Sequence, residues 1–457
     1  MRDQALSYAV ARQQKQLEEL EELLSIPSIS TQPQHKGDIA HAAGWLADHL
    51  LAIGMTRAQV MPTSGHPIVF AEWLGAGKDK PTVLIYGHYD VQPAEPYELW
   101  HTQPFKPEVR GHNLYARGAS DDKGQFFMHV KAVESYLRTS GKLPVNVKFI
   151  IEGEEEIGGP NLDPFIEQNA GLLASSVALI SDTGMPGPDL PALTYALRGL
   201  CYMELEVTSP KRDLHSGSFG GAVYNPIQAL SEIIVRLKDE RGHILIPGFY
   251  DRVRPLDDEE RRVLAEAPFD EAAFRAEAGI PSTWGERGYT VLEQITARPT
   301  LDCNGIWGGY TGEGSKTVLP SKASAKISMR LVPDQDHEEI GKLFRDYVTK
   351  IAPPQVKIDV RGMQGGRPAL VERNSPAIRA AATALERAFG RKPVFVREGG
   401  SIPVVTTFKS VLGVPTVLMG FGLSDDNLHS PNEKFYLPNF YRGIQASIHF
   451  LDELAQA

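Results

Sequence analysis

The stretch Val147-Lys148-Phe149-Ile150-Ile151-Glu152-Gly153-Glu154-Glu155-Glu156-Ile157-Gly158-Gly159 joins a short apolar run to a cluster of acids. Four carboxylates within five residues repel one another, and burial makes their charge costly unless cations or protons neutralise them. A solvated charge run is the ordinary interpretation of such a cluster. The apolar run before it and the Gly-Gly pair after it instead predict a strand and a loop at the carboxyl edge of a parallel sheet, where α/β proteins place their sites.

Length and composition limit the classes of protein to consider. The 457 residues allow two or three domains, and 42% hydrophobic and 23% charged residues are typical globular values. A formal net charge of −10 without a Lys/Arg cluster argues against nucleic acid or anionic membranes as partners. No apolar run approaches the roughly 18 residues of a membrane span, and the polar start lacks a signal-peptide core, so we expect a cytoplasmic protein. Cys201 and Cys303 are the only cysteines, and we expect buried thiols rather than a disulfide or a cysteine-based metal site.

A histidine and an aspartate follow another predicted strand, at 82–86. His88 and Asp90 point to the same face if that strand continues, because side chains alternate with period two. Asp90 could then accept the second ring N–H of a metal-ligating His88 and fix its orientation. A hydrogen-bonded structural histidine is the alternative.

Further strand ends and one helix start add candidate ligands. Asp182 and His429 each follow a predicted strand, and Asp121 and Asp122 begin a predicted helix, where carboxylates commonly do no more than cap. The candidates on separate loops are His88, Asp121, Glu155 or Glu156, Asp182 and His429. Two imidazoles and three or four carboxylates would hold two divalent ions, with one carboxylate bridging and a water between them. A spare glutamate could take the proton of that water, so the set predicts hydrolase chemistry.

From about residue 194 the pattern changes to the alternation of half-exposed strands. The predicted elements are a strand at 201–208, a helix at 225–238, a polar stretch to about 300, a strand at 325–331, a helix at 337–351 and a strand at 355–360. This order suits a small antiparallel sheet backed by two helices, and the Gly/Pro-rich segment 362–368 predicts a hinge back. We therefore expect an α/β catalytic domain at 1–193 and 368–457, with a mainly parallel central sheet flanked by helices, and an inserted α+β ferredoxin-like domain at 194–367.

Five motifs resemble those of the M20 metallopeptidase family, in order along nearly the whole chain. They are Gly87-His88-Tyr89-Asp90-Val91, Ala116-Arg117-Gly118 to Asp121-Asp122-Lys123-Gly124, Glu155-Glu156-Ile157-Gly158, Ser181-Asp182 and His429-Ser430-Pro431-Asn432-Glu433. Further stretches resemble the dipeptidase branch of the family: Leu197-Arg198-Gly199, Asp213-Leu214-His215-Ser216-Gly217, Lys316-Thr317-Val318-Leu319-Pro320, Arg330-Leu331-Val332-Pro333 and Arg397-Glu398-Gly399-Gly400-Ser401-Ile402-Pro403. The resemblance implies that the inserted domain is a lid and dimerisation domain.

The resemblance also implies a ligand set. One metal would be held by His88 and Asp182, the other by Glu156 and His429, with Asp121 bridging. Two divalent ions per chain are implied, zinc first, with manganese or cobalt as alternatives because carboxylate-rich two-metal sites accept several ions. Asp rather than Glu at position 182 resembles the di- and tripeptidase branches more than the N-acyl-amino-acid deacylases.

Two residues near the metals receive roles from the resemblance. Glu155 becomes the general base, a role that favours a carboxyl group with a raised pKa beside other acids. Asp90 would orient His88. Because Glu154, Glu155 and Glu156 are consecutive, a slip of one residue would exchange base and ligand, and the register to Ile157-Gly158 favours Glu155 as base.

The inserted domain receives the remaining roles. His215 resembles the residue that family dimers donate to the partner subunit's site, where it stabilises the oxyanion. Arg330 resembles the anchor of the substrate carboxylate, suited to bidentate pairing. Thr317 and Ser401 match substrate-contact positions, for which loop and turn structure is the alternative.

The function that follows is hydrolysis of dipeptides or very short peptides by a cytoplasmic homodimer, through a metal-bridged water with a glutamate base. The first alternative is an M20-type deacylase or amidohydrolase acting on N-acyl amino acids or a peptide-like metabolite. A second is a catalytically inactive protein that keeps the fold, against which the full set of ligands and base argues.

Overall fold

The computed structural model describes residues 1–400 and 402–456. The chain forms two compact units. The first comprises Met1–Tyr195, Val371–Val396 and Val404–Ala457, and the second comprises Ala196–Leu370 and Arg397–Pro403. The domain boundaries expected from the sequence, at 193/194 and 367/368, stay a prediction. No feature of the sequence indicated that 397–403 would group with the second unit.

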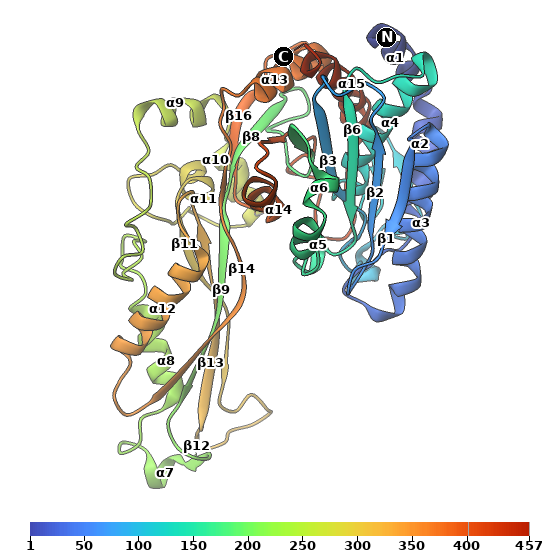
Figure 1. The fold of residues 1–457 in the computed structure, drawn as a ribbon. Coiled ribbons are helices and arrows are strands. Elements are labelled where there is room, and N and C mark those ends of the chain that lie inside the picture. The colour runs from blue at the N-terminus through green and yellow to red at the C-terminus, as the bar shows by residue number, and fades with distance from the viewer. Residues whose placement is uncertain (401, 457) are drawn as a thin grey trace. The chain divides into compact units, whose positions relative to one another are not determined.

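A mainly parallel sheet forms the centre of the first unit, in the order β1-β2-β6-β3-β7-β17-β8 (Figure 1). Neighbouring strands are parallel from β6 through β3 and β7 to β17, and antiparallel at both ends. The strands are β1 (Arg57–Met61), β2 (Ile68–Trp73), β3 (Thr82–His88), β6 (Asn146–Glu152), β7 (Val177–Ile180), β8 (Ala192–Leu197), β16 (Val394–Glu398) and β17 (Thr416–Leu418). This sheet confirms the predicted α/β class.

The register of the parallel strands sets the position of the site. Every residue of β6 is buried, as expected for a parallel strand covered on both faces. His88, at the end of β3, lies opposite Glu152, at the end of β6. The acidic turn therefore begins beside the histidine, although 63 residues lie between His88 and Glu152 in the sequence. Parallel pairing of β3 and β6 brings their carboxyl ends together.

Helices cover both faces of this sheet. Figure 1 shows α2, α3 and α4 on one side of β2, β3 and β6, and α5 and α6 on the other. The helices are α1 (Arg2–Ala11), α2 (Gln13–Leu24), α3 (Lys36–Ile53), α4 (Lys123–Ser140), α5 (Leu162–Gln168), α6 (Ala170–Leu173), α13 (Pro376–Phe389), α14 (Val404–Thr407) and α15 (Leu437–Leu454), with short turns η1 (Pro33–His35), η2 (Tyr97–Leu99), η3 (Glu155–Ile157) and η4 (Phe408–Leu412). A small sheet, β18-β5-β4, consists of β4 (Glu108–Arg110), β5 (Asn113–Tyr115) and β18 (Lys434–Tyr436).

The second unit contains a four-stranded antiparallel sheet in the order β11-β13-β9-β14, with α8 and α12 packed on it. Its elements are β9 (Gly199–Thr208), β10 (Leu214–His215), α7 (Ser216–Phe219), α8 (Pro226–Val235), α9 (Asp258–Glu266), α10 (Glu271–Ala278), α11 (Val291–Thr296), β11 (Thr300–Gly308), β12 (Val318–Leu319), β13 (Lys322–Leu331), α12 (His337–Ile351), β14 (Lys357–Gly366) and β15 (Ala369–Leu370). The chain order β9-α8-β11-β13-α12-β14 is ferredoxin-like, as predicted.

Two details of the second unit differ from the predictions. Strand β11 was missed because its sequence, Thr300 to Gly308, leaves most side chains exposed and lacks a clear apolar alternation. The expected hinge at 362–368 is wrong for its first part, since β14 extends to Gly366 with a register shift between Gly362 and Gly365. Glycine residues there permit an irregular strand rather than a break.

Cys201 and Cys303 are both free thiols. Cys201 is buried in β9, as expected, but Cys303 is exposed. The prediction is wrong for Cys303 because it lies on β11, an outer strand with exposed side chains. Within residues 1–400 and 402–456, no helix is long and apolar enough to cross a membrane.

Candidate active site

The predicted metal ligands lie on separate loops of the first unit. His88 ends β3 and is fully buried, and Asp121 lies just before α4. Glu155 and Glu156 form the turn η3 after β6. Asp182 follows β7, and His429 lies in the loop between β17 and β18, with a positive φ of 58°. Segments more than 300 residues apart in sequence therefore contribute to one site.

These side chains form two groups with the geometry of metal ligands. The first group is His88, Asp121 and Asp182, and the second is Asp121, Glu156 and His429. In each group, the three residues offer one ligand atom each, and these atoms lie within 4.8 Å of one another. Asp121 belongs to both. Its Oδ1 lies 3.1 Å from His88 Nε2, and its Oδ2 lies 3.0 Å from His429 Nε2. Each oxygen of one carboxylate thus faces a different group, as a bridging ligand requires.

The charges of the site favour additional cations. Burial raises the pKa of Glu155 to about 7 and that of Glu156 to about 8, and the neighbouring Asp121 charge acts in the same direction. Burial likewise raises the pKa of Asp182 well above its usual range. A hydrogen bond to Asp121 raises the pKa of His429 to about 9. The site contains more carboxylates than positively charged groups, and divalent ions would neutralise the excess negative charge.

The donor set fits such ions. It consists of imidazole nitrogens and carboxylate oxygens, which suit zinc, manganese and cobalt. His88 Nδ1 lies 3.1 Å from the backbone carbonyl oxygen of Asp90, so Nδ1 carries the proton and Nε2 is left to bind a metal. His429 is more open, with 55% of its side chain exposed, and leaves the second group accessible from solvent.

Asp90 has a wider structural role than the sequence suggested. Its side chain is fully buried, and its Oδ1 lies 3.5 Å from His88 Nδ1. The same carboxylate accepts hydrogen bonds from the backbone N–H groups of Glu155 at 3.2 Å and Glu156 at 3.1 Å. Asp90 therefore fixes the acidic turn as well as facing the histidine.

Glu433 is a buried anchor that the sequence analysis quoted in a motif but gave no role. Its Oε1 accepts hydrogen bonds from the backbone N–H groups of Ser120 at 3.0 Å and Asp121 at 3.2 Å. Its Oε2 accepts from Gly118 N–H at 2.9 Å and from the Arg117 guanidinium at 2.8 Å. Glu433 thus holds the loop that carries the shared carboxylate. The Asn-Glu pair directly after His429-Ser430-Pro431 was the available signal.

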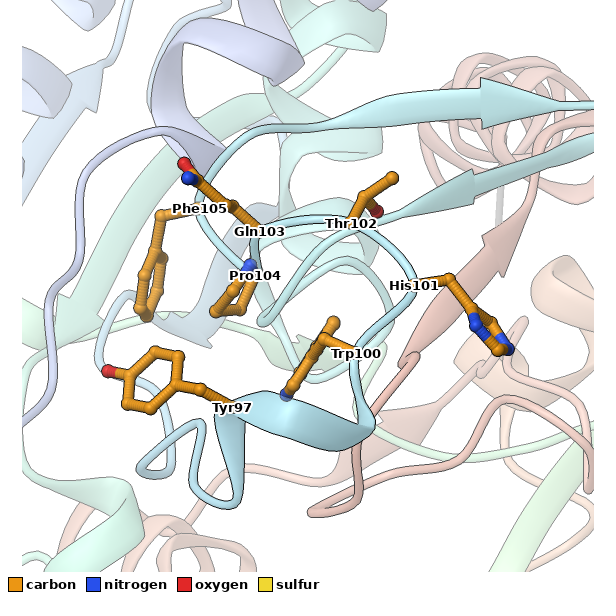
Figure 2. A pocket seen from close by; sticks show the side chains of 7 residues that line it. All are labelled: Tyr97, Trp100, His101, Thr102, Gln103, Pro104 and Phe105. Atoms are coloured by element: carbon orange, nitrogen blue, oxygen red, sulfur yellow. The ribbon is translucent and has the colours of Figure 1, made fainter.

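Asn432 links the His429 loop to a neighbouring segment. It accepts a hydrogen bond from His101 N–H at 2.8 Å and donates one to the Leu99 carbonyl at 2.9 Å. Leu99 and His101 belong to a loop that lines a hollow of about 590 Å³ (Figure 2). The hollow is lined by Tyr97, Trp100, His101, Thr102, Gln103, Pro104 and Phe105. None of the candidate metal ligands lines it.

The predicted substrate-contacting residues that the structure describes lie in the second unit. His215 is exposed on β10, and its Nδ1 accepts a hydrogen bond from Gly217 N–H at 3.1 Å. That contact leaves the proton on Nε2, where it can be donated to a ligand. Arg330 is half-buried near the end of β13, and Thr317 is exposed before β12. Ser401 lies outside the described residues.

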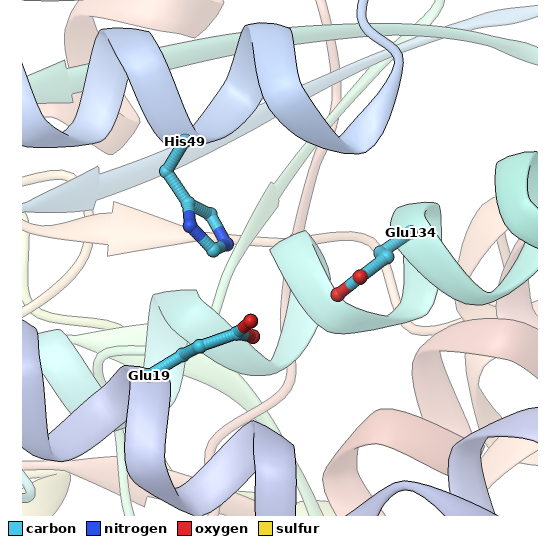
Figure 3. A group of neighbouring side chains, drawn as sticks. All are labelled: Glu19, His49 and Glu134. Atoms are coloured by element: carbon cyan, nitrogen blue, oxygen red, sulfur yellow. The ribbon is translucent and has the colours of Figure 1, made fainter.

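A third His-carboxylate group, which the sequence analysis did not identify, consists of Glu19, His49 and Glu134 (Figure 3). Their side chains point toward one another from α2, α3 and α4. The Lys131 ammonium already contacts all three: it bonds Glu19, and lies 2.8 Å from His49 Nε2 and 2.7 Å from Glu134 Oε2. The chain itself supplies the cation at this position, so the group is structural.

Comparison with known proteins places this geometry in a family. The model of peptidase family M20/M25/M40 matches residues 84–453, a span that contains every candidate metal ligand. The chain belongs to this peptidase family. The predicted M20 resemblance is therefore confirmed.

The most similar relatives include dipeptidases. The chain is 34% identical over 451 residues to the Cys-Gly metallodipeptidase of Candida albicans, covering 94% of this chain and 93% of that protein. It is 32% identical over 472 residues to the human Beta-Ala-His dipeptidase, covering 99% and 93%. Among solved structures, the di-peptidase Dug1p of Saccharomyces cerevisiae has a TM-score of 0.86 at 28% identity, covering 100% of this chain and 99% of that one. These relatives bear out the predicted dipeptidase branch of the M20 family.

Proposed function

We propose that this M20 peptidase is a two-metal dipeptidase in which Asp121 bridges the ions and Glu155 is the general base. The observation that carries the proposal is the sharing of Asp121 between two ligand groups, one oxygen facing each. His88 and Asp182 would hold one ion, and Glu156 and His429 the other. The ions would activate the attacking water and polarise the peptide carbonyl. Zinc is the first choice, and manganese or cobalt would suit the same donors.

Glu155 is suited to proton transfer. Burial and the neighbouring acids raise its pKa to about 7. A pKa near neutral pH suits a residue that first accepts a proton and then donates it. Its backbone N–H is held by Asp90, which fixes the turn. The carboxylate takes a proton from the attacking water and later donates it to the leaving amine.

The second unit supplies substrate contacts in this proposal. His215 Nε2–H stabilises the oxyanion of a partner subunit's site, and Arg330 pairs with the substrate carboxylate, with Thr317 and Ser401 as further contacts. A homodimer is supported by β11, an outer strand whose Ile306 and Trp307 are 55% and 45% exposed. Exposed apolar side chains on an unpaired strand edge favour pairing with another chain. Cytoplasmic placement remains part of the proposal, and the two free thiols are consistent with it.

Hydrolysis of matched substrates tests the proposal. Free dipeptides and their N-acetylated forms should be compared with metal-loaded protein, and the free dipeptides should be cleaved faster. Preference for the acetylated forms would favour the deacylase alternative. Absence of cleavage of either, with metal bound, would indicate an inactive member of the family.

The role of His215 needs a separate experiment. Protein carrying His215→Ala and protein carrying Glu155→Gln should each be inactive alone and should regain activity when mixed, because a mixed dimer contains one intact composite site. Continued inactivity of the mixture, with mixed dimers verified, would refute a contribution across the dimer.

A further inference from the structure

A hollow in the second unit has a wall that contains none of the residues that the proposed function uses. Its volume is about 280 Å³. The turn after α8, the helices α10 and α11, the segment between them and the strand β11 all contribute to its wall. This volume is just below the roughly 300 Å³ at which sites for drug-sized ligands begin, so it suits one small molecule rather than a peptide.

Two oppositely charged groups at this hollow are incompletely paired. Lys238 Nζ lies 3.6 Å from Asp302 Oδ1, beyond hydrogen-bonding distance, and 4.9 Å from the centre of the Trp284 ring. Among residues 1–400 and 402–456, the Lys238 ammonium has no hydrogen bond. Lys238 and Asp302 therefore offer one donor group and one acceptor group side by side.

The other charged pair in the wall is already satisfied. Arg298 donates to both carboxylate oxygens of Glu286, at 2.8 and 2.9 Å. The Arg298 guanidinium also lies over the rings of Tyr289 and Tyr250, at 4.3 and 5.4 Å. The Arg298–Glu286 pair therefore has a structural role in the wall. Lys238 and Asp302 are the charged groups that can pair with a ligand.

Part of the remaining wall is apolar, and two of its large apolar side chains are exposed. Trp284 and Ile280 are 67% and 38% exposed, although both line the hollow. Phe274 and Leu301 line it as well. A ligand with an apolar body would remove Trp284 and Ile280 from water, which favours binding in proportion to the area covered.

We propose that this hollow binds a free amino acid with a large apolar side chain. The ligand carboxylate pairs with Lys238, its ammonium group pairs with Asp302, and its side chain packs against Trp284, Ile280 and Leu301. A zwitterion can pair with both Lys238 and Asp302, whereas a fatty acid would pair only with Lys238 and an amine only with Asp302. The inference goes beyond the proposed function: binding does not depend on catalysis, although free amino acids are also what a dipeptidase releases.

Titration of the full-length protein with L-leucine tests the proposal. Binding is measured by calorimetry and by tryptophan fluorescence. Metal-depleted protein should bind L-leucine as the loaded protein does, because the hollow contains no metal ligand. Isoamylamine, which lacks the carboxylate, and 4-methylpentanoate, which lacks the ammonium group, should bind at least about tenfold more weakly, the loss expected for one charge-assisted pair.

Variants locate the binding. Lys238→Met and Asp302→Asn should each weaken L-leucine binding by about tenfold or more. Lys322→Met is the matched control, because Lys322 pairs with Glu206 at 3.0 Å on the same unit and does not line the hollow. Trp284→Phe should remove the fluorescence change while calorimetric binding persists. Unchanged affinity in the first two variants, or binding that disappears with the metals, would overturn the proposal.

Discussion

The first unit contains two kinds of His-carboxylate cluster, and they differ in the origin of their positive charge. Around Glu19, His49 and Glu134, Lys131 lies at the centre and contacts all three side chains. Around Asp121, the ion pairs of the ligand carboxylates are with His88 and His429, and among residues 1–400 and 402–456 no lysine or arginine pairs with them. A covalently attached cation makes the first cluster structural. In the proposed function, the second cluster takes its cations from outside the chain, as a metal centre.

The histidines of the two clusters show the same contrast. Burial and the Lys131 charge lower the pKa of His49 to about 3, so the ring stays neutral. The hydrogen bond to Asp121 raises the pKa of His429 to about 9. An internal lysine therefore supplies the positive charge of one cluster. In the other cluster a protonated histidine supplies it, and we propose that metal ions would displace that proton.

Removing the base of the metal centre should have the largest effect. We expect Glu155→Gln to reduce turnover by roughly 10⁴-fold, near the upper range for general acid–base catalysis, while both metals remain bound. Glu19→Gln, the matched change in the other cluster, should leave turnover nearly unchanged. Steady-state hydrolysis and metal analysis of the two proteins give the test. Substantial residual turnover in Glu155→Gln would refute the assignment of the base.

Removing the Lys131 ammonium should convert the structural cluster into one that needs an added metal ion. Lys131→Met leaves two partly buried carboxylates without this ammonium group, with only the longer contacts to Lys15 and Arg138 remaining. It should lower the free energy of unfolding by about 3 kcal/mol, the lower end for breaking a buried pair. Added Zn²⁺ or Mn²⁺ should recover part of that loss. The experiment is a denaturant titration with and without metal. Equal stability of variant and wild type would mean that Lys131 does not determine the character of the cluster.

Weakening the Glu433 anchor should affect only the metal centre. Glu433→Gln presents an amide N–H₂ where a carboxylate oxygen now accepts two hydrogen bonds, and should weaken metal affinity by about 10–100-fold. Glu206→Gln, at a surface ion pair with Lys322, is the control. Competition with a fluorescent chelator measures the affinity. Unaltered metal binding would show that Glu433 does not position Asp121.

The smallest effect that we expect is on the pH dependence of stability, through His49 of the Lys131 cluster. Because the folded-state pKa of His49 is about 3 and its ordinary value is 6.5, the unfolded chain binds a proton between these values that the folded chain does not. Stability should therefore fall as pH drops below 6.5, by about 1.4 kcal/mol per pH unit from this residue. His49→Gln should reduce the slope by that amount. Burial lowers the pKa of His129 to about 3 as well, so part of the slope should remain. An unchanged slope in urea titrations at pH 6 and 5 would contradict this account.

The local sequence was enough to predict much of the fold and to identify the candidate ligands that the structure brings together. His88, Asp182 and Glu156 follow strands that apolar runs identify, and parallel strands bring their carboxyl ends to one edge. The ferredoxin-like order followed from alternation in 201–208 and 325–331. Strand β11 was missed because an outer strand can keep its side chains exposed, and the same exposure explains the error for Cys303.

Long-range hydrogen bonds were beyond the sequence analysis. Glu433 lies 312 residues from Asp121, and the motif that contains it singles out the residue without indicating its four hydrogen bonds. The carboxylate of Asp90 was expected to face only His88, yet it also holds the Glu155 turn. The Lys131 cluster combines three helices at positions whose sequence suggests ordinary surface ion pairs. Such contacts depend on how helices and loops pack, which periodicity does not reveal.

Stepwise metal addition tests the central claim most directly. Metal-depleted protein is titrated with Zn²⁺ or Mn²⁺ while bound metal and hydrolysis of a free dipeptide are measured in the same samples. A shared Asp121 predicts that turnover rises to its maximum at about two ions per chain, and that Asp121→Ala loses both turnover and full metal binding. Full turnover at one ion per chain, or an Asp121→Ala protein that still binds two ions and cleaves the dipeptide, would contradict the account.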